Sequence, residues 1–304
     1  MKEVTIITVS YKSSHIICDA LDSIVNKGYR IIVVDNGSND DIEQVLKDRY
    51  PGSDIELIIL KSNCGFGRAN NVALKMVKTK FSLLLNPDAI IHEESIDNLV
   101  KYANKDKKIA LASPLDVKNI PPSNKEINES IENHKRAFGK HLDKGNHIET
   151  EFLCGGFLLL KMEVFNKIGF FDKKIFLYFE DSELCKRSIK EGHKNILVKN
   201  SFCKHVQSTS TATKSLFEKY FLLYKRHWHM GWSKMHLKKN KSLTSFIFGF
   251  FIKLLSIILH LMKLDFTTTV SRFGKLMGMT SNILGIDCFN DKNKTPKIKK
   301  KTII

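Results

Sequence analysis

The chain has 304 residues, with 49 Lys and Arg against 32 Asp and Glu, which gives a formal net charge of +17. A hydrophobic content of 42% with 20 Phe residues excludes an intrinsically disordered chain and a collagen-like one, and the length suits one large domain or two modest ones. The six cysteines are scattered without a C-x-x-C pair, which indicates reduced thiols rather than a disulfide framework or a zinc cluster. The N-terminal residues lack the apolar segment and cleavage site of a secretory signal, so no signal is expected.

The positive charge is concentrated near the C-terminus. Residues 234–304 hold 14 basic and 3 acidic side chains, whereas residues 1–233 hold 35 and 29. This excess predicts a polyanionic partner, either a nucleic acid or an anionic membrane surface.

The first hundred residues alternate between strand-like and helix-like runs. Apolar, mostly β-branched runs predict four buried strands, at 4–9, 31–34, 55–60 and 81–85. Helical spacing of apolar residues predicts two crossover helices, over 42–50 behind a capping cluster at 38–40, and over 69–77. This alternation predicts a parallel sheet with helices on both faces, and ligands of such sheets bind at the carboxyl ends of the strands.

Polar segments follow all four predicted strands. They are Ser10-Tyr11, Asp35-Asn36-Gly37-Ser38, Asn63-Cys64-Gly65-Phe66-Gly67 and Asn86-Pro87-Asp88-Ala89. Each segment alone is an ordinary turn sequence. Four of them at one edge of a sheet predict a ligand-binding edge.

The second half of the chain begins with a polar, Pro-, Asn- and Lys-rich stretch over 114–150, which predicts a mobile excursion. A strand is expected over 152–160, with a break at Gly155-Gly156 where a ligand can approach the backbone. Glu180-Asp181 then precedes a helix predicted over 182–191 and closed by Gly192. Adjacent carboxylates at a helix N-terminus complement the helix dipole, and a catalytic base has the same sequence pattern.

These stretches, in this order, resemble the inverting family-2 glycosyltransferases with a GT-A fold, and in particular rhamnosyltransferase-like bacterial polysaccharide enzymes. The matching segments are TIITVSYKSS (5–14), IIVVDNGSNDD (31–41), NCGFGRANN (63–71), LLLNPDAII (83–91), CGGFLLLKMEVFNKIGFFDKKIFLYFEDSELCKRSIKEG (154–192) and His205. The resemblance implies an α/β fold with a Rossmann-like, mostly parallel sheet flanked by helices. It also implies a nucleotide-sugar-binding half over 1–113 and an acceptor-binding and catalytic half over 114–233. The charge and apolar pattern of residues 234–304, beyond the resemblance, predict a C-terminal helical, membrane-associating extension, a basic amphipathic tail.

The resemblance implies a metal site made by Asp88 and His205. Asn86-Pro87-Asp88 stands where the family has a D-x-D motif, and the Asn at the first position leaves Asp88 as the metal carboxylate. A carboxylate with an imidazole suits Mn²⁺ at least as well as Mg²⁺. A divalent cation neutralises the charge that grows on a departing diphosphate. The alternatives are an Asn-Pro-Asp turn and a structural histidine.

The resemblance also assigns the remaining site residues. Asp181 matches the general base that takes the proton of the acceptor hydroxyl, with Glu180 as the fallback. Asp35 matches the carboxylate that binds the base or ribose. The other residues expected to line the nucleotide are Ser10, Tyr11, Gly65, Phe66, Gly67, Asn70 and Asp88, and those expected near the donor or acceptor sugar are Gly155, Gly156 and Glu180. Tyr11 as a base-stacking ring competes with Tyr11 as ordinary packing. The run Gly65-x-Gly67-x-x-Asn70 lacks the third Gly of a dinucleotide fingerprint, which argues against a dehydrogenase.

The tail contains a 17-residue apolar run, 246–262, interrupted by Lys253 and His260. As a helix it rises about 25 Å, short of the roughly 30 Å hydrocarbon core of a bilayer. Its small and polar residues form one stripe: Ser245, Gly249, Lys253, Ser256, His260 and Lys263. The pattern predicts a helix in a membrane interface with this stripe toward the headgroups, the alternative being a helix packed on protein. Residues 292–301 are expected to form a solvated, disordered basic tail.

The leading hypothesis is a peripheral enzyme on the cytoplasmic face of the plasma membrane. It would transfer rhamnose or a similar hexose, with inversion and a divalent metal, from a nucleoside-diphosphate sugar to a lipid-linked or polysaccharide acceptor. Alternatives are a galactofuranosyl- or glucosyltransferase of the same family, a relative that binds without catalysis, and a basic nucleic-acid-binding protein. No nucleic-acid motif is recognised, so no nucleic-acid partner is expected. A homo-oligomer is compatible with the sequence.

Overall fold

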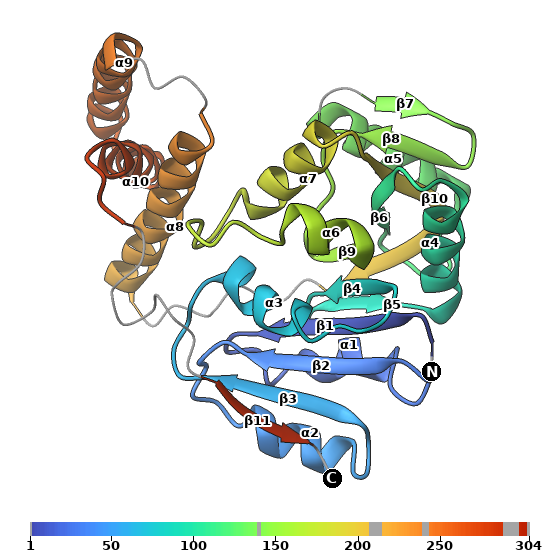
Figure 1. Cartoon of the computed structure of the whole chain (residues 1–304). Coiled ribbons are helices and arrows are strands. Elements are labelled where there is room, and N and C mark those ends of the chain that lie inside the picture. Colours follow the sequence, from blue (N-terminus) through green and yellow to red (C-terminus); the bar gives the residue numbers. More distant parts are fainter. Residues whose placement is uncertain (1, 139–140, 207–214, 239–242, 288–297, 303–304) are drawn as a thin grey trace. The chain divides into compact units, whose positions relative to one another are not determined.

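The computed structural model describes residues 2–138, 141–206, 215–238, 243–287 and 298–302 (Figure 1). It consists of two compact units, and each is considered by itself. Unit 1 comprises Met1–Asp172, Asp181–Ser208 and Thr295–Ile304, and unit 2 comprises Lys173–Glu180 and Thr209–Lys294.

Unit 1 is built on one mixed sheet whose described strands number 11. Their order is β11-β3-β2-β1-β4-β9-β6-β10-β8-β7, with β5 on β10. The bounds are β1 Val4–Ser10, β2 Arg30–Asp35, β3 Ile55–Leu60, β4 Phe81–Leu85, β5 Ala89–Ile91, β6 Ile109–Asp116, β7 His141–Asp143, β8 His147–Thr150, β9 Phe157–Lys161, β10 Lys194–His205 and β11 Ile298–Thr302.

The four strands predicted from the first hundred residues are confirmed. β3, β2, β1 and β4 pair in parallel, with Ser10 opposite Asp35 at the carboxyl ends of β1 and β2. The expectation of a parallel sheet does not extend to the rest, because β9 pairs antiparallel with β4 and β6, and β5 and β8 pair antiparallel with β10. The strand predicted over 152–160 begins only after the Gly155-Gly156 turn.

Helices cover both faces of this sheet, as expected. The helices of unit 1 are α1 Ile17–Asp22, α2 Ile42–Arg49, α3 Phe66–Leu74, α4 Glu93–Lys105, α5 Asn124–Ala137, α6 Met162–Ile168 and α7 Glu180–Lys190, whose first residue falls in unit 2. Strand side chains alternate between two hydrophobic clusters. One contains Ile6 and Val33 together with residues of α1, α2 and α4, and the other contains Ile7 and Ile32 together with residues of α3, α5 and α6.

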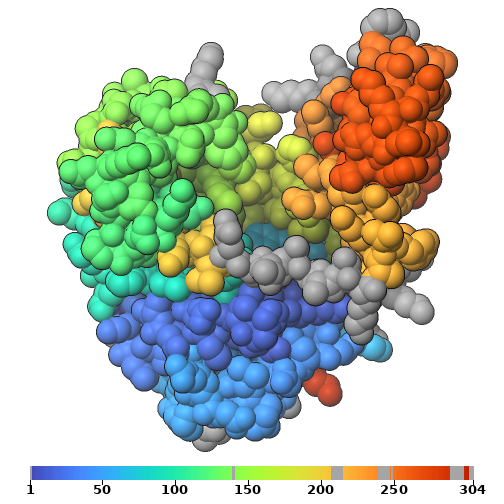
Figure 2. Space-filling model, turned by 180° about the vertical axis from the view of Figure 1, so that it is seen from behind, coloured from blue at the N-terminus to red at the C-terminus, as the bar shows by residue number. Residues whose placement is uncertain are grey.

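The stretch 114–150, predicted to be a mobile excursion, is a regular part of unit 1. It completes β6 and then forms α5, β7 and β8, with the described part drawn in green over the surface in Figure 2. Ser123 makes a capping box with Glu126 at the start of α5, and Ile131 and Ile148 are buried in the core. The prediction overlooked this capping box and the widely spaced apolar residues, because polar composition dominates the stretch.

The C-terminal end was also predicted incorrectly. Residues 298–301, expected within a disordered basic tail, belong to β11, which pairs antiparallel with β3 at the edge of the sheet (Figure 1). The preceding residues of that predicted tail, 292–297, lie outside the described part of the chain. An unpaired edge strand accepts backbone hydrogen bonds whatever the charge of the segment that adds to it.

The described part of unit 2 consists of three helices, α8 Leu216–His236, α9 Leu243–Met262 and α10 Phe266–Ile283, together with the segment Lys173–Glu180. Glycines let α8 and α10 approach very closely. A Cβ atom on Gly231 would lie 2.1 Å from the Lys275 carbonyl oxygen, and one on Gly278 would lie 1.9 Å from that of Trp228. Asp265 caps α10 by accepting a hydrogen bond from the Thr268 N–H at 3.0 Å.

The helix predicted over 246–262 is confirmed as α9, but its orientation differs from the prediction. Ser256 accepts a hydrogen bond from Arg272 of α10, and Lys253 is half-buried, so the polar stripe faces the other helices of the unit. The apolar residues point outward instead, with Phe251 62% and Leu255 59% exposed. The prediction that the stripe faces headgroups is therefore wrong. Among the described residues, no helix has the length and apolarity needed to span a bilayer.

Candidate active site

The carboxyl end of β2 carries Asp35, which is only 4% exposed. Its Oδ1 accepts a hydrogen bond of 2.9 Å from the Ser38 N–H. Burial is the main cause that raises the pKa of this carboxyl, opposed by hydrogen bonds from Ser38, while the charge of Asp40 raises it further. Asp35 is thus a carboxylate held in a fixed position at the sheet edge that the sequence predicts to bind a ligand.

Asn36 ties the turn after β2 to the segment after β3. Its Oδ1 accepts from the Cys64 N–H at 3.0 Å, and its Nδ2 donates to Asn63 Oδ1 at 3.1 Å. Gly37 adopts φ +73°, and a Cβ there would lie 2.5 Å from the backbone of Ser62. Two of the predicted polar segments therefore form one connected surface.

Ser10 and Tyr11, at the end of β1, lie in different environments. Ser10 is fully buried, and its carbonyl accepts from the Asn36 N–H at 2.8 Å, so its contribution to this edge is through the backbone. Tyr11 is 44% exposed, with the Lys12 ammonium 5.7 Å from its ring centroid. An exposed ring beside a lysine does not fit core packing, which leaves it open to a ligand.

The segment after β3 turns into α3, with Gly65 at φ +87° before the first helical residue. Phe66 packs edge-on against Phe171, with ring centroids 6.0 Å apart, and a Cβ on Gly67 would lie 2.9 Å from Phe171 Cβ. Asn70 is buried and donates to the Phe66 carbonyl at 3.1 Å, so it stabilises the start of α3 rather than an open surface.

Asn86 and His205 meet at Gly156. The Asn86 N–H donates to the Gly156 carbonyl at 2.8 Å. A Cβ on Gly156 would lie 2.8 Å from Asn86 Nδ2 and 3.4 Å from His205 Nε2. The absence of a side chain at 156 therefore keeps the space between these two groups open.

Asp88, Asp116 and His205 form the charged part of the site. His205 lies opposite Ala89 in the antiparallel pairing of β10 with β5, and the next N–H, of Val206, donates to the Asp88 carbonyl at 2.7 Å. His205 Nδ1 lies 3.1 Å from Asp116 Oδ2. Burial acts to lower the pKa of His205, but the hydrogen bond that the ring donates to Asp116 and the charges of Asp116 and Asp88 outweigh it, so the pKa is raised.

The described residues hold no group of three or more His, Cys, Asp or Glu side chains arranged to bind a metal ion. The negative charge of Asp88 nevertheless acts on His205, and the ring is hydrogen-bonded through Nδ1. A carboxylate and an imidazole held in this way fit a divalent cation whose other ligands come from a bound diphosphate.

Asp181 lies beside the other glycine of the pair. Its Oδ2 accepts from the Gly155 N–H at 3.3 Å and its Oδ1 from the Ser182 N–H at 2.7 Å. A Cβ on Gly155 would lie 3.4 Å from Asp181 Cβ and 3.5 Å from a ring carbon of Phe66. Burial is the main cause that raises the pKa of Asp181, against the lowering effect of these backbone hydrogen bonds.

The residues that precede Asp181 are held in an unusual backbone conformation. Tyr178 and Phe179 both have φ +69°, a region that bulky L-residues seldom adopt. Glu180, which follows them and begins α7, is buried. Backbone strain of this kind is found more often at functional sites than elsewhere.

A cavity of about 370 Å³ adjoins this site within unit 1. Asp116 and Phe157, which line it, both contact His205, and Cys154, which also lines it, directly precedes Gly155. The opposite side is formed by α5, which contributes Asn133, and by Phe138, the residue that follows this helix. The cavity is large enough for part of a saccharide.

Sequence reasoning missed Asp116, Asn36 and Asn71. Asp116 ends β6 and follows the same post-strand rule as Asp35, but the prediction of a mobile stretch from 114 removed it from consideration. Asn36 was quoted in a turn without a role. Asn71 exchanges two hydrogen bonds with the backbone of Phe171, at 2.9 and 3.0 Å, a long-range contact for which the sequence carries no signal.

One protein-family model matches a range of the chain that contains most of the candidate site residues. The model described as Glycosyl transferase family 2 matches residues 5–169. This range includes the ends of β1, β2, β3 and β4 and the Gly155-Gly156 turn.

Curated proteins that match the chain include the following three glycosyltransferases. Agl10, a low-salt glycan biosynthesis hexosyltransferase of Haloferax volcanii, is 26% identical over 63% of this chain and 63% of its own length, so the match spans less than two-thirds of that protein. The rhamnosyltransferase WbbL of Escherichia coli K12 is 25% identical over 80% of this chain and 95% of its own length. The N-acetylglucosaminyl-diphospho-decaprenol L-rhamnosyltransferase of Mycobacterium tuberculosis is 23% identical over 68% of this chain and 78% of its own length.

Among solved structures, the mannosyltransferase PcManGT of Pyrobaculum calidifontis, in complex with GDP-Man and Mn²⁺, is similar with a TM-score of 0.56. The similarity covers 93% of this chain and 87% of that one, at 16% identity, and therefore concerns the fold alone. The predicted GT-A α/β fold with a C-terminal helical region is confirmed.

Proposed function

Since this chain belongs to glycosyl transferase family 2, we propose that it transfers a hexose, rhamnose in the first place, from a nucleoside diphosphate to a hydroxyl group of a lipid-linked or polysaccharide acceptor. Two of the relatives are named as rhamnosyltransferases, and the name of one of them includes a decaprenol-linked substrate. These names support the choice of sugar and of acceptor.

One observation carries the proposal. The carboxylate of Asp181 accepts a hydrogen bond from Gly155, and the next residue, Gly156, adjoins His205 and Asn86. A half-buried carboxylate thus lies on one side of a two-residue turn, and the charged group around His205 lies on the other. A displacement at an anomeric carbon needs this arrangement, with a base for the attacking hydroxyl and a place for the departing diphosphate.

The nucleotide would lie along the ends of β1 and β2. Asp35 is held in position to accept hydrogen bonds from a ribose or a base, and the exposed ring of Tyr11 offers a face for stacking. The glycines at 37 and 65 keep the intervening loops close to the sheet, so that backbone atoms can approach the ligand.

Asp88 and His205 would hold a divalent cation, Mn²⁺ or Mg²⁺, and the bound cation would supply positive charge for the diphosphate as it departs. Asp116 is a positioning residue here. Its carboxylate fixes the His205 ring through Nδ1 and leaves Nε2 directed to the space beside Gly156.

Asp181 acts as the general base in this proposal. Its carboxylate takes the proton from the acceptor hydroxyl while that oxygen forms a bond to the anomeric carbon. The bond from that carbon to the diphosphate oxygen breaks in the same step, and its electron pair leaves with the diphosphate. A single displacement of this kind inverts the configuration at the anomeric carbon.

The cavity beside Asp116, Cys154 and Phe157 is the proposed acceptor site. It is lined by α5, which follows β6 in the half of the chain assigned to the acceptor, 114–233. The division into 1–113, 114–233 and 234–304 remains a prediction about function. The same holds for a peripheral position on the cytoplasmic face of the plasma membrane, for contact with an anionic membrane surface, and for a homo-oligomer.

The first experiment is a thermal-shift screen of the full chain with a panel of nucleotide sugars, with and without Mn²⁺. We expect a dTDP-activated rhamnose to raise the melting temperature in a metal-dependent manner. Transfer from that donor to a polyprenyl-diphosphate sugar is then followed by NMR, which reports the anomeric configuration of the product. A product that retains the anomeric configuration of the donor would contradict the proposal. So would a screen in which none of the nucleotide sugars raises the melting temperature.

A further inference from the structure

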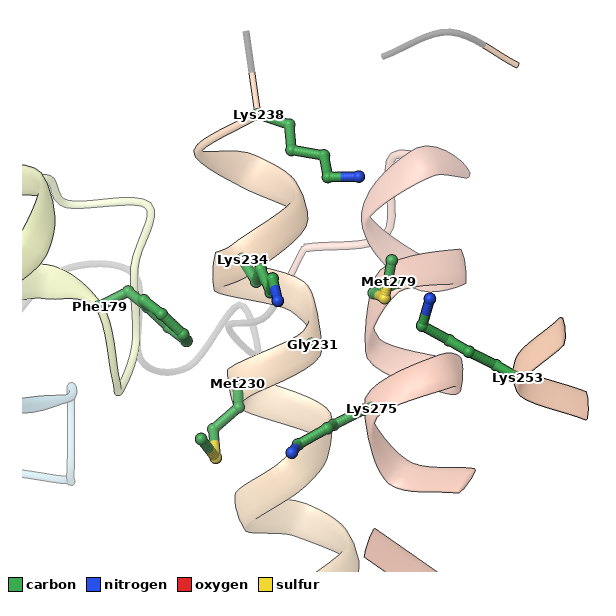
Figure 3. A pocket seen from close by; sticks show the side chains of 8 residues that line it. All are labelled: Phe179, Met230, Gly231, Lys234, Lys238, Lys253, Lys275 and Met279. Atoms are coloured by element: carbon green, nitrogen blue, oxygen red, sulfur yellow. The ribbon is translucent and has the colours of Figure 1, made fainter. Parts of the chain in front are cut away.

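Unit 2 contains a cavity of about 210 Å³ whose lining includes four lysines (Figure 3). Lys234 comes from the C-terminal end of α8, Lys238 from the segment just after that helix, Lys253 from α9 and Lys275 from α10. In Figure 3 the side chain of Lys275 extends from α10 toward α8, and that of Lys253 extends from α9 toward α10. Lys253 is half-buried, whereas the other three lysines are exposed to solvent.

No carboxylate neutralises this lysine cluster among the residues that the structure describes. No ion pair joins Lys234, Lys238, Lys253 or Lys275 to a described acidic residue. Burial is the main cause that lowers the pKa of Lys253, and the charges of Lys238 and Lys234 lower it further. The cluster therefore holds mutually repelling positive charges, which a bound anion would stabilise.

The remainder of the lining is apolar and closely packed. Met230, Met279 and Phe179 contribute hydrophobic side chains. Gly231 also lines the cavity, at the point where α8 and α10 approach each other most closely. Because the backbones of the two helices are in contact there, the helices that carry Lys234 and Lys275 are held in fixed positions relative to each other.

A wide apolar surface belongs to the same unit. The outward face of α9 exposes Phe251, Ile252, Leu255, Ile258 and Leu259, while Lys253 on the opposite face reaches the cavity. One helix thus presents hydrocarbon on one side and a cation on the other. A ligand that combines a phosphate group with a long apolar chain matches both features.

We propose that the four-lysine cavity of unit 2 binds the phosphate or diphosphate group of a membrane amphiphile, with the exposed face of α9 lying among its hydrocarbon chains. The lysine cluster is an anion site in its own right. Its assignment to the diphosphate of a lipid-linked acceptor rests on the proposed function.

The test measures binding of the full chain to vesicles, in the presence of a chelator and without any sugar donor. Three vesicle types are compared: phosphatidylcholine alone, the same lipid with a polyprenyl diphosphate, and the same lipid with phosphatidylglycerol at equal negative charge. Inorganic pyrophosphate in solution is titrated in parallel. The pocket variant is Lys253→Gln with Lys275→Gln, and the matched control is Lys219→Gln with Lys263→Gln, which removes two exposed lysines of α8 and of the turn after α9.

We expect the pocket variant to lose about tenfold or more in affinity for the diphosphate vesicles, and the control to lose at most a few-fold. The charge-preserving variant Lys253→Arg with Lys275→Arg should retain binding, which separates loss of charge from loss of fold. Equal losses of affinity in the pocket and control variants would contradict binding at the cavity. They would indicate only diffuse attraction between surface charge and the vesicles.

Two further arms identify the source of the phosphate. Pyrophosphate that binds as tightly as the diphosphate vesicles would overturn the assignment to an amphiphile. Tighter binding to polyprenyl-diphosphate vesicles than to phosphatidylglycerol vesicles supports the acceptor, and equal binding overturns that assignment. Because no donor or metal is present, failure of the transfer reaction and failure of this inference remain distinguishable.

Discussion

His205 Nδ1 lies 3.1 Å from Asp116 Oδ2, where the parallel strands β10 and β6 end side by side. When Nδ1 donates its proton to Asp116, the lone pair of the imidazole is on Nε2, the atom that adjoins Gly156. Carboxylate–histidine pairs of this kind orient metal-binding imidazoles and increase their basicity. The pair explains how a site with only two predicted protein ligands can be well positioned.

Substitution of this group should weaken metal-dependent binding. We expect Asp88→Ala and His205→Ala each to reduce the affinity for Mn²⁺ in the presence of a nucleoside diphosphate, because each removes a proposed ligand. Asp116→Asn should have a smaller effect, a reduction of about 10- to 100-fold, because it removes only the orienting partner. Isothermal titration of Mn²⁺ into each variant measures the effect.

Asp143→Asn is a suitable control for these variants, because Asp143 is exposed and forms an ion pair with Lys199 outside the candidate site. Affinity that stays at the wild-type level in Asp88→Ala and His205→Ala would remove both residues from the metal site. A loss in Asp116→Asn as large as that in His205→Ala would indicate that Asp116 is itself a ligand.

Asp181→Asn should abolish transfer and leave donor binding nearly intact, because it removes the base with little change in volume. General base catalysis typically contributes about 10²- to 10⁴-fold in rate. Since burial raises the pKa of Asp181, the wild-type rate should fall with decreasing pH at a higher pH than an exposed carboxylate would give. Rate measurements on both proteins across pH test this. Near wild-type turnover in Asp181→Asn, with loss in Glu180→Gln, would transfer the role to Glu180.

Asp35→Ala should reduce the affinity for the whole nucleotide, whether or not it carries a sugar. The proposed contact is a hydrogen bond to a charged group, and its loss costs about 1.5–3 kcal/mol. Asp41→Asn is the control, because Asp41 is exposed and lies directly before α2. This variant should bind the nucleotide with normal affinity. Titration with the free nucleoside diphosphate and with the sugar nucleotide decides the question. A loss confined to the sugar nucleotide would show that Asp35 contacts the sugar instead.

The sequence predicted the strands that form the edge of the candidate site well, because they are built from local signals. Each of the four strands is a short apolar run, and the polar residues that follow, such as Asp35 and Asp88, lie at one sheet edge by the geometry of parallel strands. The proposed metal-binding pair, Asp88 and His205, depends on long-range pairing as well as on local signals. His205 reaches the site only through the antiparallel pairing of β10 with β5, which joins residues far apart in the chain.

The failures have a common physical cause. Asp116, α5 and β11 belong to segments with polar or basic composition, and each is ordered by contacts with distant residues. β11 is ordered by backbone hydrogen bonds to β3, which are independent of side-chain hydrophobicity. The stripe on α9 was identified correctly as a pattern, but a pattern does not say which face a neighbouring helix covers. In unit 2 the stripe residue Lys253 lines a cavity together with residues of α8 and α10, and the apolar residues of α9 are exposed instead.

Asn133→Ala should raise the KM for the acceptor and leave donor hydrolysis unchanged. Asn133 lines the cavity beside Asp116 and Cys154 from the α5 side. Loss of one neutral hydrogen bond to a saccharide costs about 0.5–1.5 kcal/mol, so the expected change is a few-fold to about tenfold. Lys125→Ala, on an exposed part of α5, is the control. Equal kinetics for both variants would remove the cavity from the acceptor site.

The last prediction concerns β11, which covers the edge of β3. The sequence of β3 is IELIIL, and its apolar residues make it a template for pairing with other chains once the edge is open. Deletion of residues 298–304 should therefore lower the melting temperature and promote aggregation on heating, as followed by circular dichroism and light scattering. The deletion also removes positive charge, so the matched control is Lys299→Gln with Lys300→Gln, which keeps the backbone of the strand. We expect this control to behave like the wild type, because pairing with β3 depends on backbone hydrogen bonds. If the control aggregates as readily as the truncated chain, charge rather than strand pairing protects this edge. If neither variant differs from the wild type, β11 contributes nothing to the stability of unit 1.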